Sequence, residues 1–309
     1  MSAALRLGVI GLSPGNGHPY SWSAIFNGYD AAAMEHCGFP VIPRYLEKQR
    51  FPDDAIAGAR VTHVWTQNSA LSRHIAQATL IDHVVEYPAD MIGQVDAVLL
   101  ARDDAENHRR FAEPFIAAGL PIYIDKPLAH SRQAAIDFFA LETRPAQIFS
   151  CSALRFAEEM LLSPREVDRM GGISHISARV PKSWSKYAIH VVDPILRNCG
   201  PFDNIRNVRA RSFGPDGSGT EVSFEWSDEE RTCEIRAFGS EPSPISVAYS
   251  GPKGAVDTQF KDSFSAFKSA LETFLKDSVR GQVSHAVDVI EAMKVLELGA
   301  GVFSLQEND

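Results

Sequence analysis

A lysine follows directly after an apolar run that has the composition of a buried strand. The run Leu120 to Ile124 leads into Asp125, Lys126 and Pro127, so Lys126 is expected at the carboxyl end of a strand, where open α/β sheets bind their ligands. An ammonium there can hold a substrate hydroxyl, stabilise a developing alkoxide and share in proton transfer. The alternative is a surface lysine at a strand exit, the commoner situation for this residue type.

A second group of ionisable residues lies between Lys186 and Asp193. Lys186, His190 and Asp193 are spaced by four and then three residues, so they share one face if a helix begins near Tyr187. His190 can then act as a general base near neutral pH, with Asp193 orienting its ring. The alternative is a half-buried structural histidine satisfied by a neighbouring carboxylate.

A glycine-rich turn follows the first apolar run, residues 5–12. A strand, such a turn and a helix open a dinucleotide-binding unit, because small residues let backbone N–H groups approach a pyrophosphate. Ser13 stands where the second glycine of the G-x-G-x-x-G pattern belongs, so the alternative is a tight turn without a ligand. The small residues of the turn are Gly11, Ser13, Gly15 and Gly17.

Strand-like and helix-like segments alternate over the first 125 or so residues. This alternation predicts a parallel sheet with helices on both faces. The first helix is expected to begin near Ser21 or Ser23, residues 39–58 are expected to form a surface excursion, and Asp103 or Asp104 is expected to cap a later helix. The strand-like runs are 5–12, 60–66, 83–86, 95–101 and 120–127, and 69–78 is predicted as a helix.

The remainder of the chain has a different pattern. Short strand-like runs separated by turn residues predict a mostly antiparallel sheet, and two helices close the chain. The expected fold is α/β, with a Rossmann doubly wound parallel sheet over 1–127 and an α+β domain with a mostly antiparallel open sheet over 128–309. The closing helices can pack back on the first domain. The strand-like runs are 146–156, 173–180, 205–213, 221–226, 233–238 and 246–250.

Composition excludes several classes of protein. The 309 residues are 45% hydrophobic and 22% charged, which indicates a globular protein of about two domains. A net charge of -9 has the wrong sign for nucleic acid or an anionic membrane, so small-molecule chemistry is expected.

The four cysteines lack metal-ligand spacing, so neither a metal site nor a disulfide framework is expected. The first apolar run is too short for a signal sequence or membrane span, which favours the cytoplasm.

The segments described above occur in the order and spacing of a known family. The block that ends in Asp125, Lys126 and Pro127 resembles a family block ending in Glu-Lys-Pro, and Tyr187–Asp193 is similar to the family's Gly-Ile-His-x-x-Asp segment. Residues 153–156 look like the first strand of the family's substrate domain. The chain therefore resembles, over nearly its whole length, the Gfo/Idh/MocA oxidoreductases, the group of glucose-fructose oxidoreductase and inositol dehydrogenase.

The resemblance implies a cofactor, a reaction and a catalytic pair. NAD or NADP is the implied cofactor, and hydride passes between it and a CH–OH group of a sugar, polyol or sugar-derived acid. His190 takes the hydroxyl proton, and Lys126 orients the substrate and the cofactor ribose. The resemblance also implies a homodimer or homotetramer. The implied pyrophosphate contacts are Gly11, Ser13, Gly15 and Gly17.

Departures from the family pattern affect the expected cofactor site. Asp103 and Asp104 stand where a Thr-Pro pair is common, and two carboxylates there would repel a pyrophosphate unless they point away or meet ribose hydroxyls. The strand before Gln67 and Asn68 does not end in an acid that accepts from the ribose 2′-hydroxyl, so the choice between NAD and NADP stays open. Gln67, Asn68, Asp103 and Lys126 complete the expected cofactor contacts.

Other departures affect the expected substrate site. Asp125 replaces the usual Glu, a conservative change, whereas Lys186 occupies the place of an Asp four residues before the histidine. This reversal of charge favours an acidic sugar or sugar phosphate, or alters the proton relay. Cations suit acidic groups and aromatic rings suit sugar faces. The expected substrate contacts are Arg155, Trp184, Lys186, Tyr187 and Asp193.

Two other functions fit the same residues. A redox-neutral lyase, epimerase or hydrolase could retain its nicotinamide through the whole reaction. A regulator that binds a dinucleotide or metabolite would use the same fold without turnover, if the altered loop and the Asp103 and Asp104 pair have abolished catalysis.

Overall fold

The computed structural model of the protein describes residues 4–227 and 231–304. The chain forms two compact units, each built from several segments. Unit 1 contains Met1–Leu128, Asp137–Ser150 and Ser263–Ala286, and unit 2 contains Ala129–Ile136, Cys151–Asp262 and Val287–Asp309. The first segment of unit 1 ends one residue after the predicted boundary, and the chain then returns to unit 1 twice.

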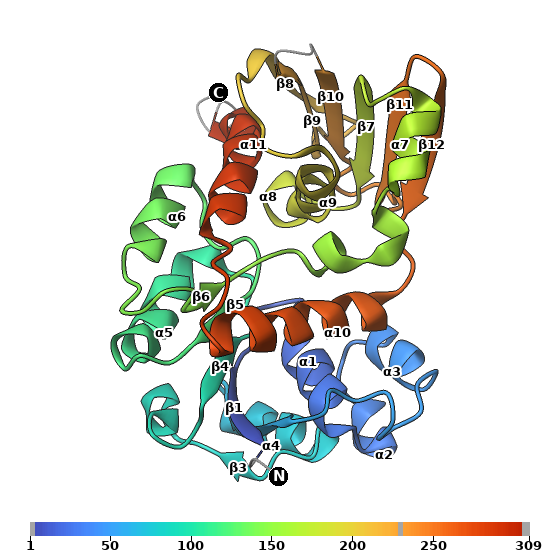
Figure 1. The fold of residues 1–309 in the computed structure, drawn as a ribbon. Helices are drawn as coiled ribbons and strands as arrows, with labels where there is room; N and C mark the ends of the chain where they lie inside the picture. The colour runs from blue at the N-terminus through green and yellow to red at the C-terminus, as the bar shows by residue number, and fades with distance from the viewer. Residues whose placement is uncertain (1–3, 228–230, 305–309) are drawn as a thin grey trace. The chain divides into compact units, whose positions relative to one another are not determined.

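Unit 1 contains a parallel six-stranded sheet in the order β3-β2-β1-β4-β5-β6 (Figure 1). All of its strand pairs are parallel, and the inner strands are buried apolar runs, as expected where helices cover both faces. This confirms the predicted Rossmann sheet. The strands are β1 Leu5–Ile10, β2 Ala59–Trp65, β3 His83–Val84, β4 Ala97–Leu100, β5 Ile122–Ile124 and β6 Ile148–Phe149.

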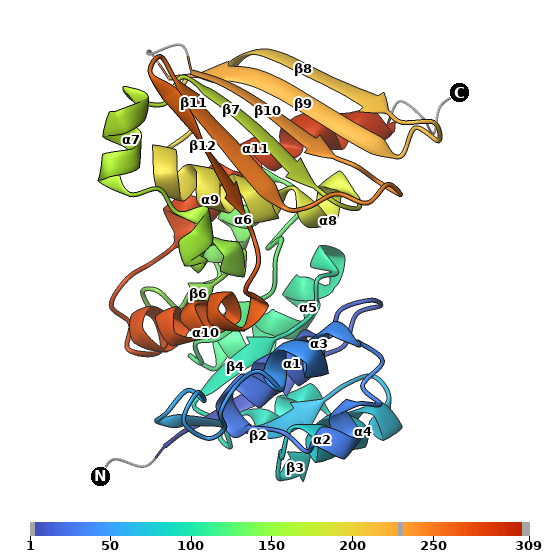
Figure 2. The same ribbon diagram turned by 90° about the vertical axis from the view of Figure 1, so that its right-hand side faces the viewer.

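The helices of unit 1 differ from the prediction at two places. α1 begins at His18, before the expected start, because Pro19 is favourable in a first helical turn, where a missing N–H costs nothing. Residues 39–58 include α3 with buried Ile42 and Leu46, so they are not a surface excursion. α10 lies beside α1 (Figures 1 and 2). The helices are α1 His18–Asn27, α2 Ala31–Met34, α3 Val41–Leu46, α4 Ser69–Ala78, α5 Ala105–Ala117 and α10 Ser263–Phe274, with short turns at Pro88–Met91 and Leu275–Val279.

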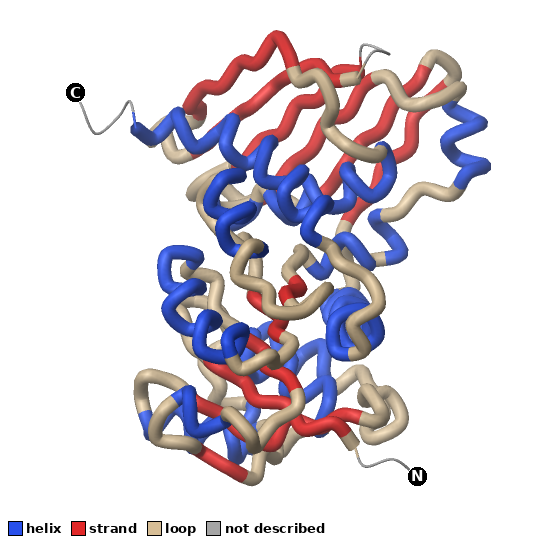
Figure 3. The backbone as a smooth tube through the Cα atoms, turned by 60° about the vertical axis from the view of Figure 1, so that its left-hand side comes forward, coloured by secondary structure: helices blue, strands red, loops and turns tan. Residues whose placement is uncertain are grey.

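Unit 2 contains a second six-stranded sheet, in the order β12-β11-β7-β10-β9-β8. Only the pair of β10 and β7 is parallel; the other four are antiparallel, which confirms the mostly antiparallel sheet. Figures 2 and 3 show helices against one face of this sheet. The strands are β7 His175–Val180, β8 Arg206–Phe213, β9 Gly219–Trp226, β10 Arg231–Ala237, β11 Ser246–Gly251 and β12 Gly254–Gln259.

The helices of unit 2 carry most of the second group of predicted site residues. They are α7 Pro164–Met170, α8 Trp184–Tyr187, α9 Ile189–Cys199 and α11 Ala286–Ser304, while α6 Arg132–Phe139 spans the change from unit 2 to unit 1. No helix within the described residues is long and apolar enough to cross a membrane.

The predicted strand over residues 146–156 is wrong in its second half. β6 ends at Phe149 and pairs with β5 in the first sheet, and Ala153–Phe156 is a 3₁₀ helix. The Ser152 hydroxyl accepts a hydrogen bond from Leu154 N at 3.3 Å. This cap favours a helical turn over an extended chain, although the residues that follow are mostly apolar.

Candidate functional site

The predicted cofactor residues of unit 1 follow neighbouring strands at one edge of the sheet. Ile10 is paired with both Trp65 and Leu100, and Leu100 is paired with Ile124. The segments that follow these four residues therefore leave the sheet at the same level. They contain Gly11 to Gly17, Gln67 and Asn68, Asp103, and Lys126. The fold thus brings these predicted residues to the carboxyl edge, where α/β sheets bind ligands.

The two aspartates after β4 each have a partner within the protein. Ser13 Oγ donates to Asp103 Oδ1 at 2.6 Å, and Asp103 N donates to Ser13 Oγ at 3.0 Å. Arg102 donates through Nε and Nη2 to the two oxygens of Asp104, at 2.9 and 2.5 Å. Burial alone would raise the pKa of Asp104, but the hydrogen bonds from Arg102 and Asn107 hold it below its ordinary value. The charge of Asp104 is therefore balanced at short range.

Asp104 was expected as a capping residue and does not cap with its side chain. It occupies the N-cap position of α5, but its carboxylate makes no capping hydrogen bond. The bidentate pair with Arg102, which is 7% exposed, takes up both oxygens instead. Sequence inspection missed Arg102 because a single arginine after a strand carries no motif.

The two amides after β2 are also bound by the protein. Gln67 Nε2 donates to Leu12 O at 2.7 Å, and Gln67 Oε1 accepts from Arg102 Nη1 at 3.1 Å. Asn68 Oδ1 caps α4, accepting from Ala70 N at 2.9 Å. In this structure Gln67 links the turns after β1 and β4, and Asn68 begins a helix. Their contact with a cofactor stays a prediction.

Three glycines of the turn are required, one for its backbone conformation and two for close packing. Gly15 has φ +78° and open space around an added Cβ, so it is needed for its backbone conformation. A Cβ on Gly17 would lie 2.6 Å from Ile42 Cδ1 and 2.8 Å from Phe39 Cγ. A Cβ on Gly11 would overlap the Pro19 ring. Close packing of the turn against α1 and α3 therefore explains Gly11 and Gly17.

The Gly17→Ala substitution is expected to lower the free energy of unfolding by about 1 to 3 kcal/mol, because it overpacks a filled site. Gly15→Ala should cost about 1 kcal/mol through the left-handed backbone. Urea unfolding of both variants checks this, with Gly254→Ala as the control because its added methyl group meets open space. A Gly17→Ala protein as stable as wild type would contradict the packing role.

Lys126 is not the surface residue of the alternative interpretation. It is 6% exposed and the preceding Asp125 is 1% exposed. Asp125 Oδ1 accepts a hydrogen bond from Lys126 N at 2.8 Å. Burial would raise the pKa of Asp125, but His18, Lys126 and Asn16 together hold it well below its ordinary range. The turn after β5 thus carries a buried anion next to a buried lysine.

His190 in unit 2 has a serine partner that the sequence analysis missed. Its Nδ1 lies 2.8 Å from Ser152 Oγ, and Ser152 N donates to Asp193 Oδ2 at 2.5 Å. Asp193 was expected to orient the His190 ring. It instead accepts from the backbone of Ser152, the residue whose hydroxyl contacts the ring. The ring of Tyr187 meets His190 edge-on at 5.2 Å, and Tyr187 OH accepts from Lys182 Nζ at 2.6 Å.

Two of the predicted substrate contacts are engaged elsewhere in unit 2. Arg155 Nη2 donates to Asp288 at 2.5 Å, and its Nη1 lies 3.9 Å from Asp193 Oδ1. Trp184 is 1% exposed and donates through Nε1 to Leu296 O at 2.8 Å. Trp184 is therefore a core residue and is not among the proposed substrate contacts. Lys186 is half-buried at the end of α8.

Burial raises the pKa of Asp193 to about 6, against the lowering influence of Arg155 and Ser152 N. Because this pKa lies above the unfolded value of about 3.9, the folded state binds the proton more tightly. The stability from this group is complete below about pH 4 and is lost as pH rises through about 6.

The Asp193→Asn variant is expected to lack the loss of stability that the ionisation of Asp193 causes as pH rises. Its free energy of unfolding, measured relative to wild type, should rise between about pH 4 and 6 by as much as about 3 kcal/mol. Urea unfolding across this range measures the difference, and the exposed Asp257→Asn is the control. A difference that does not change with pH would show that Asp193 ionises normally.

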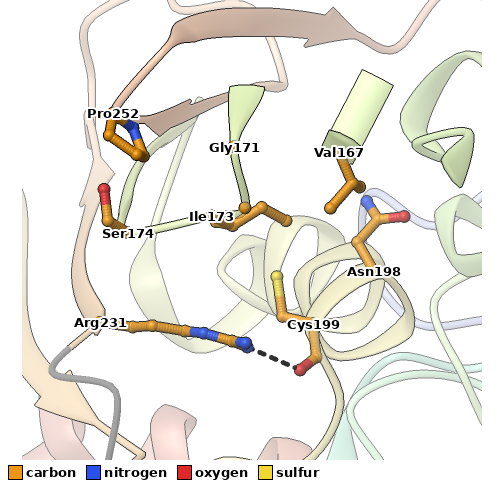
Figure 4. A pocket seen from close by; sticks show the side chains of 9 residues that line it. Val167, Gly171, Ile173, Ser174, Asn198, Cys199, Arg231 and Pro252 are labelled. Carbon is orange, nitrogen blue, oxygen red and sulfur yellow. Dashed lines mark hydrogen bonds between the residues drawn. The ribbon is translucent and has the colours of Figure 1, made fainter. Parts of the chain in front are cut away.

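A cavity of about 500 Å³ in unit 2 lies apart from the predicted site residues. Figure 4 shows Arg231 reaching the end of α9, where Nη1 donates to Cys199 O at 3.1 Å. This contact caps a helix carbonyl. Burial raises the pKa of Cys199 to about 12, so its thiol stays protonated. The cavity is lined by Val167, Gly171, Gly172, Ile173, Ser174, Asn198, Cys199, Arg231 and Pro252.

Comparison with known proteins gives one family match and many structural matches. Residues 6–152 match the Gfo/Idh/MocA family, described as an oxidoreductase family with an NAD-binding Rossmann fold, which confirms the predicted resemblance over these residues. The curated proteins contain no match.

Three solved structures illustrate the likeness of fold. Apo scyllo-inositol dehydrogenase from Lactobacillus casei is 14% identical, with a TM-score of 0.71, covering 99% of this chain and 97% of that one. UDP-N-acetylglucosamine 3-dehydrogenase GnnA from Acidithiobacillus ferrooxidans is 14% identical, with a TM-score of 0.71, covering 98% and 99%. GenD2 from gentamicin A biosynthesis, in complex with NAD, is 13% identical, with a TM-score of 0.70, covering 98% and 95%.

Proposed function

We propose that this protein, whose residues 6–152 belong to the Gfo/Idh/MocA family of NAD-binding oxidoreductases, transfers hydride between NAD or NADP and a CH–OH group of a sugar, polyol or sugar-derived acid. The observation that carries the proposal is the buried Lys126 at the carboxyl end of β5 in a Rossmann sheet. The substrate class is supported by the structural neighbours, which include a dehydrogenase of inositol and one of a nucleotide sugar.

The turn between β1 and α1 fits a dinucleotide. The N–H groups of Gly15 and Gly17 donate to no acceptor among the described residues, and an added Cβ at Gly15 would meet open space. Free N–H groups at the start of a ten-residue helix suit a pyrophosphate. Asp103 and Asp104 are held by Ser13 and Arg102, so the expected repulsion of a pyrophosphate is reduced.

The bound nicotinamide would supply the hydride acceptor or donor. In our proposal, the Lys126 ammonium holds the substrate oxygen and stabilises negative charge that develops on it. His190 takes the hydroxyl proton at Nε2, because Ser152 Oγ holds Nδ1 and fixes the orientation of the ring. Lys186 and Tyr187 are proposed as substrate contacts; a lysine in place of an acid favours a substrate with an anionic group.

A turnover assay tests this function. Purified protein is mixed with NAD or NADP and a panel of sugars, polyols and sugar acids, and formation of reduced nicotinamide is followed by absorbance. The proposal predicts turnover, with a preference for acidic substrates. Substrate consumption without net reduction, by protein that retains bound nicotinamide, would instead identify a redox-neutral lyase or epimerase. Cofactor binding without any turnover would favour the regulator.

A further inference from the structure

Side chains from the start of α1 and from the turn before it meet the turn after β5. Asn16 lies in the turn after β1, His18 is the first residue of α1, and Asp125 follows β5. Asn16 Nδ2 donates to Asp125 Oδ2 at 2.7 Å, and His18 Nδ1 lies 2.5 Å from the same oxygen. The other oxygen, Oδ1, accepts from Lys126 N at 2.8 Å. One carboxylate therefore joins the glycine-rich turn to the backbone of Lys126.

The His18 ring is held in a single orientation. The backbone N–H of His18 donates to Asn16 Oδ1 at 2.8 Å, which ties the two residues to each other. The ring stacks on Trp22 at 5.0 Å with an interplanar angle of 14°, and the edge of Phe267 meets it at 4.9 Å. Trp22 in turn stacks at 4.7 Å on Tyr123 of β5, two residues before Asp125. α1 is therefore attached to β5 both by stacked rings and by the histidine and carboxylate pair.

Charge gives the arrangement a second role. Asp125 is 1% exposed and ionised, and an uncompensated buried carboxylate is costly. Asn16 and His18 each place a side-chain nitrogen against one oxygen of this carboxylate. Loss of His18 would leave Asp125 with the hydrogen bond from Asn16 and the nearby charge of Lys126.

We propose that Asn16 and His18 are positioning residues for Lys126, which act through the Asp125 carboxylate to fix the turn that carries the lysine. The catalytic part of this inference rests on the proposed function of Lys126 in hydride transfer. The hydrogen bonds and ring contacts that define the clamp, formed by Asn16, His18 and Asp125, do not depend on that function.

Substitutions of His18 separate positioning from cofactor binding. His18→Ala is expected to lower kcat by about 10- to 100-fold, because small displacements of a catalytic group have effects of this size, while KM for the cofactor changes less than about threefold. His18→Asn places an amide nitrogen as many bonds from Cα as Nδ1, and should recover most of the lost kcat. His36→Ala, at an exposed histidine of unit 1, is the control. If His18→Ala does not fold, the milder variant Asn16→Ala replaces it in the test. Asn16→Ala should also lower kcat.

Amide hydrogen exchange of the peptide containing Lys126 is measured on the same proteins, because the Lys126 N–H is part of the clamp. The exchange rate of the Lys126 amide should be higher in the His18→Ala protein than in wild type or in His36→Ala. A kcat for His18→Ala within twofold of wild type would overturn the proposal, as would a His18→Asn enzyme no better than His18→Ala. If wild type turns over no substrate with either nucleotide, the proposed function fails. The clamp is then judged by exchange alone, and an unchanged exchange rate in His18→Ala would overturn it.

Discussion

Replacement of His190 by alanine is expected to lower kcat by about 10²- to 10⁴-fold, the range for loss of a general acid or base. The ring is the proposed acceptor of the substrate hydroxyl proton, and Ser152 Oγ holds its Nδ1 at 2.8 Å. Steady-state turnover with the best substrate of the panel measures the effect. Because His190 is half-buried and not a core side chain, the melting temperature should change little.

Two further variants make the His190 prediction specific. His190→Asn keeps a polar group that Ser152 can hold but has no basic nitrogen, so it should be nearly as inactive as His190→Ala. His175→Ala, at an exposed histidine of β7, should retain wild-type activity. Unchanged turnover in His190→Asn would remove His190 from the proton relay.

Replacement of Lys126 by alanine is expected to lower kcat by about 10²- to 10³-fold, as when a group that stabilises developing oxyanion charge is removed. The loss should appear mainly in kcat, because the proposed contact strengthens as negative charge develops on the substrate oxygen. Steady-state kinetics with the wild-type substrate and cofactor give both kcat and KM.

Conservative replacement of Lys126 should not restore activity. In Lys126→Arg the charge remains, but the planar guanidinium is larger and is held in a site where the lysine is 6% exposed. Lys48→Ala, at an exposed lysine of unit 1, is the control. A Lys126→Ala enzyme with wild-type kcat would show that the residue is structural.

Much of the fold follows from patterns that local sequence carries. The apolar runs that become β2 and β4 and the helix Ser69–Ala78 are defined by composition and periodicity within ten residues. Prediction failed where one side chain decides the local structure, as with Ser152 before the 3₁₀ helix. It also missed α7, although Ser163 and Glu166 form a capping box whose spacing is visible in the sequence.

The candidate site also contains residues that the sequence could predict and residues that it could not. Lys126 and His190 lie in short motifs, so the sequence alone could single them out. Their partners could not be predicted, because Asn16 and Asp125 are 109 residues apart and Ser152 and His190 are 38 apart. Tertiary structure, which no local pattern encodes, decides which polar residues meet.

Departures from the family pattern are explained best in pairs. Ser13, in the place of a glycine, is the hydrogen-bond partner of Asp103, which stands in the place of an uncharged residue. Asp125, in the place of a glutamate, is the common acceptor for Asn16, His18 and the Lys126 amide. Ser13 and Asp125 thus each have hydrogen-bond partners on another segment at the carboxyl edge.

The dependence on nicotinamide is tested most directly by thermal unfolding with and without NAD and NADP, with a guanine nucleotide as the control. A ligand that binds only the folded protein and is present at about 100 times its Kd stabilises it by about 2.7 kcal/mol, so one of the two dinucleotides should raise the melting temperature by several degrees. If neither dinucleotide at saturating concentration raises it above the control, the proposed oxidoreductase function is contradicted.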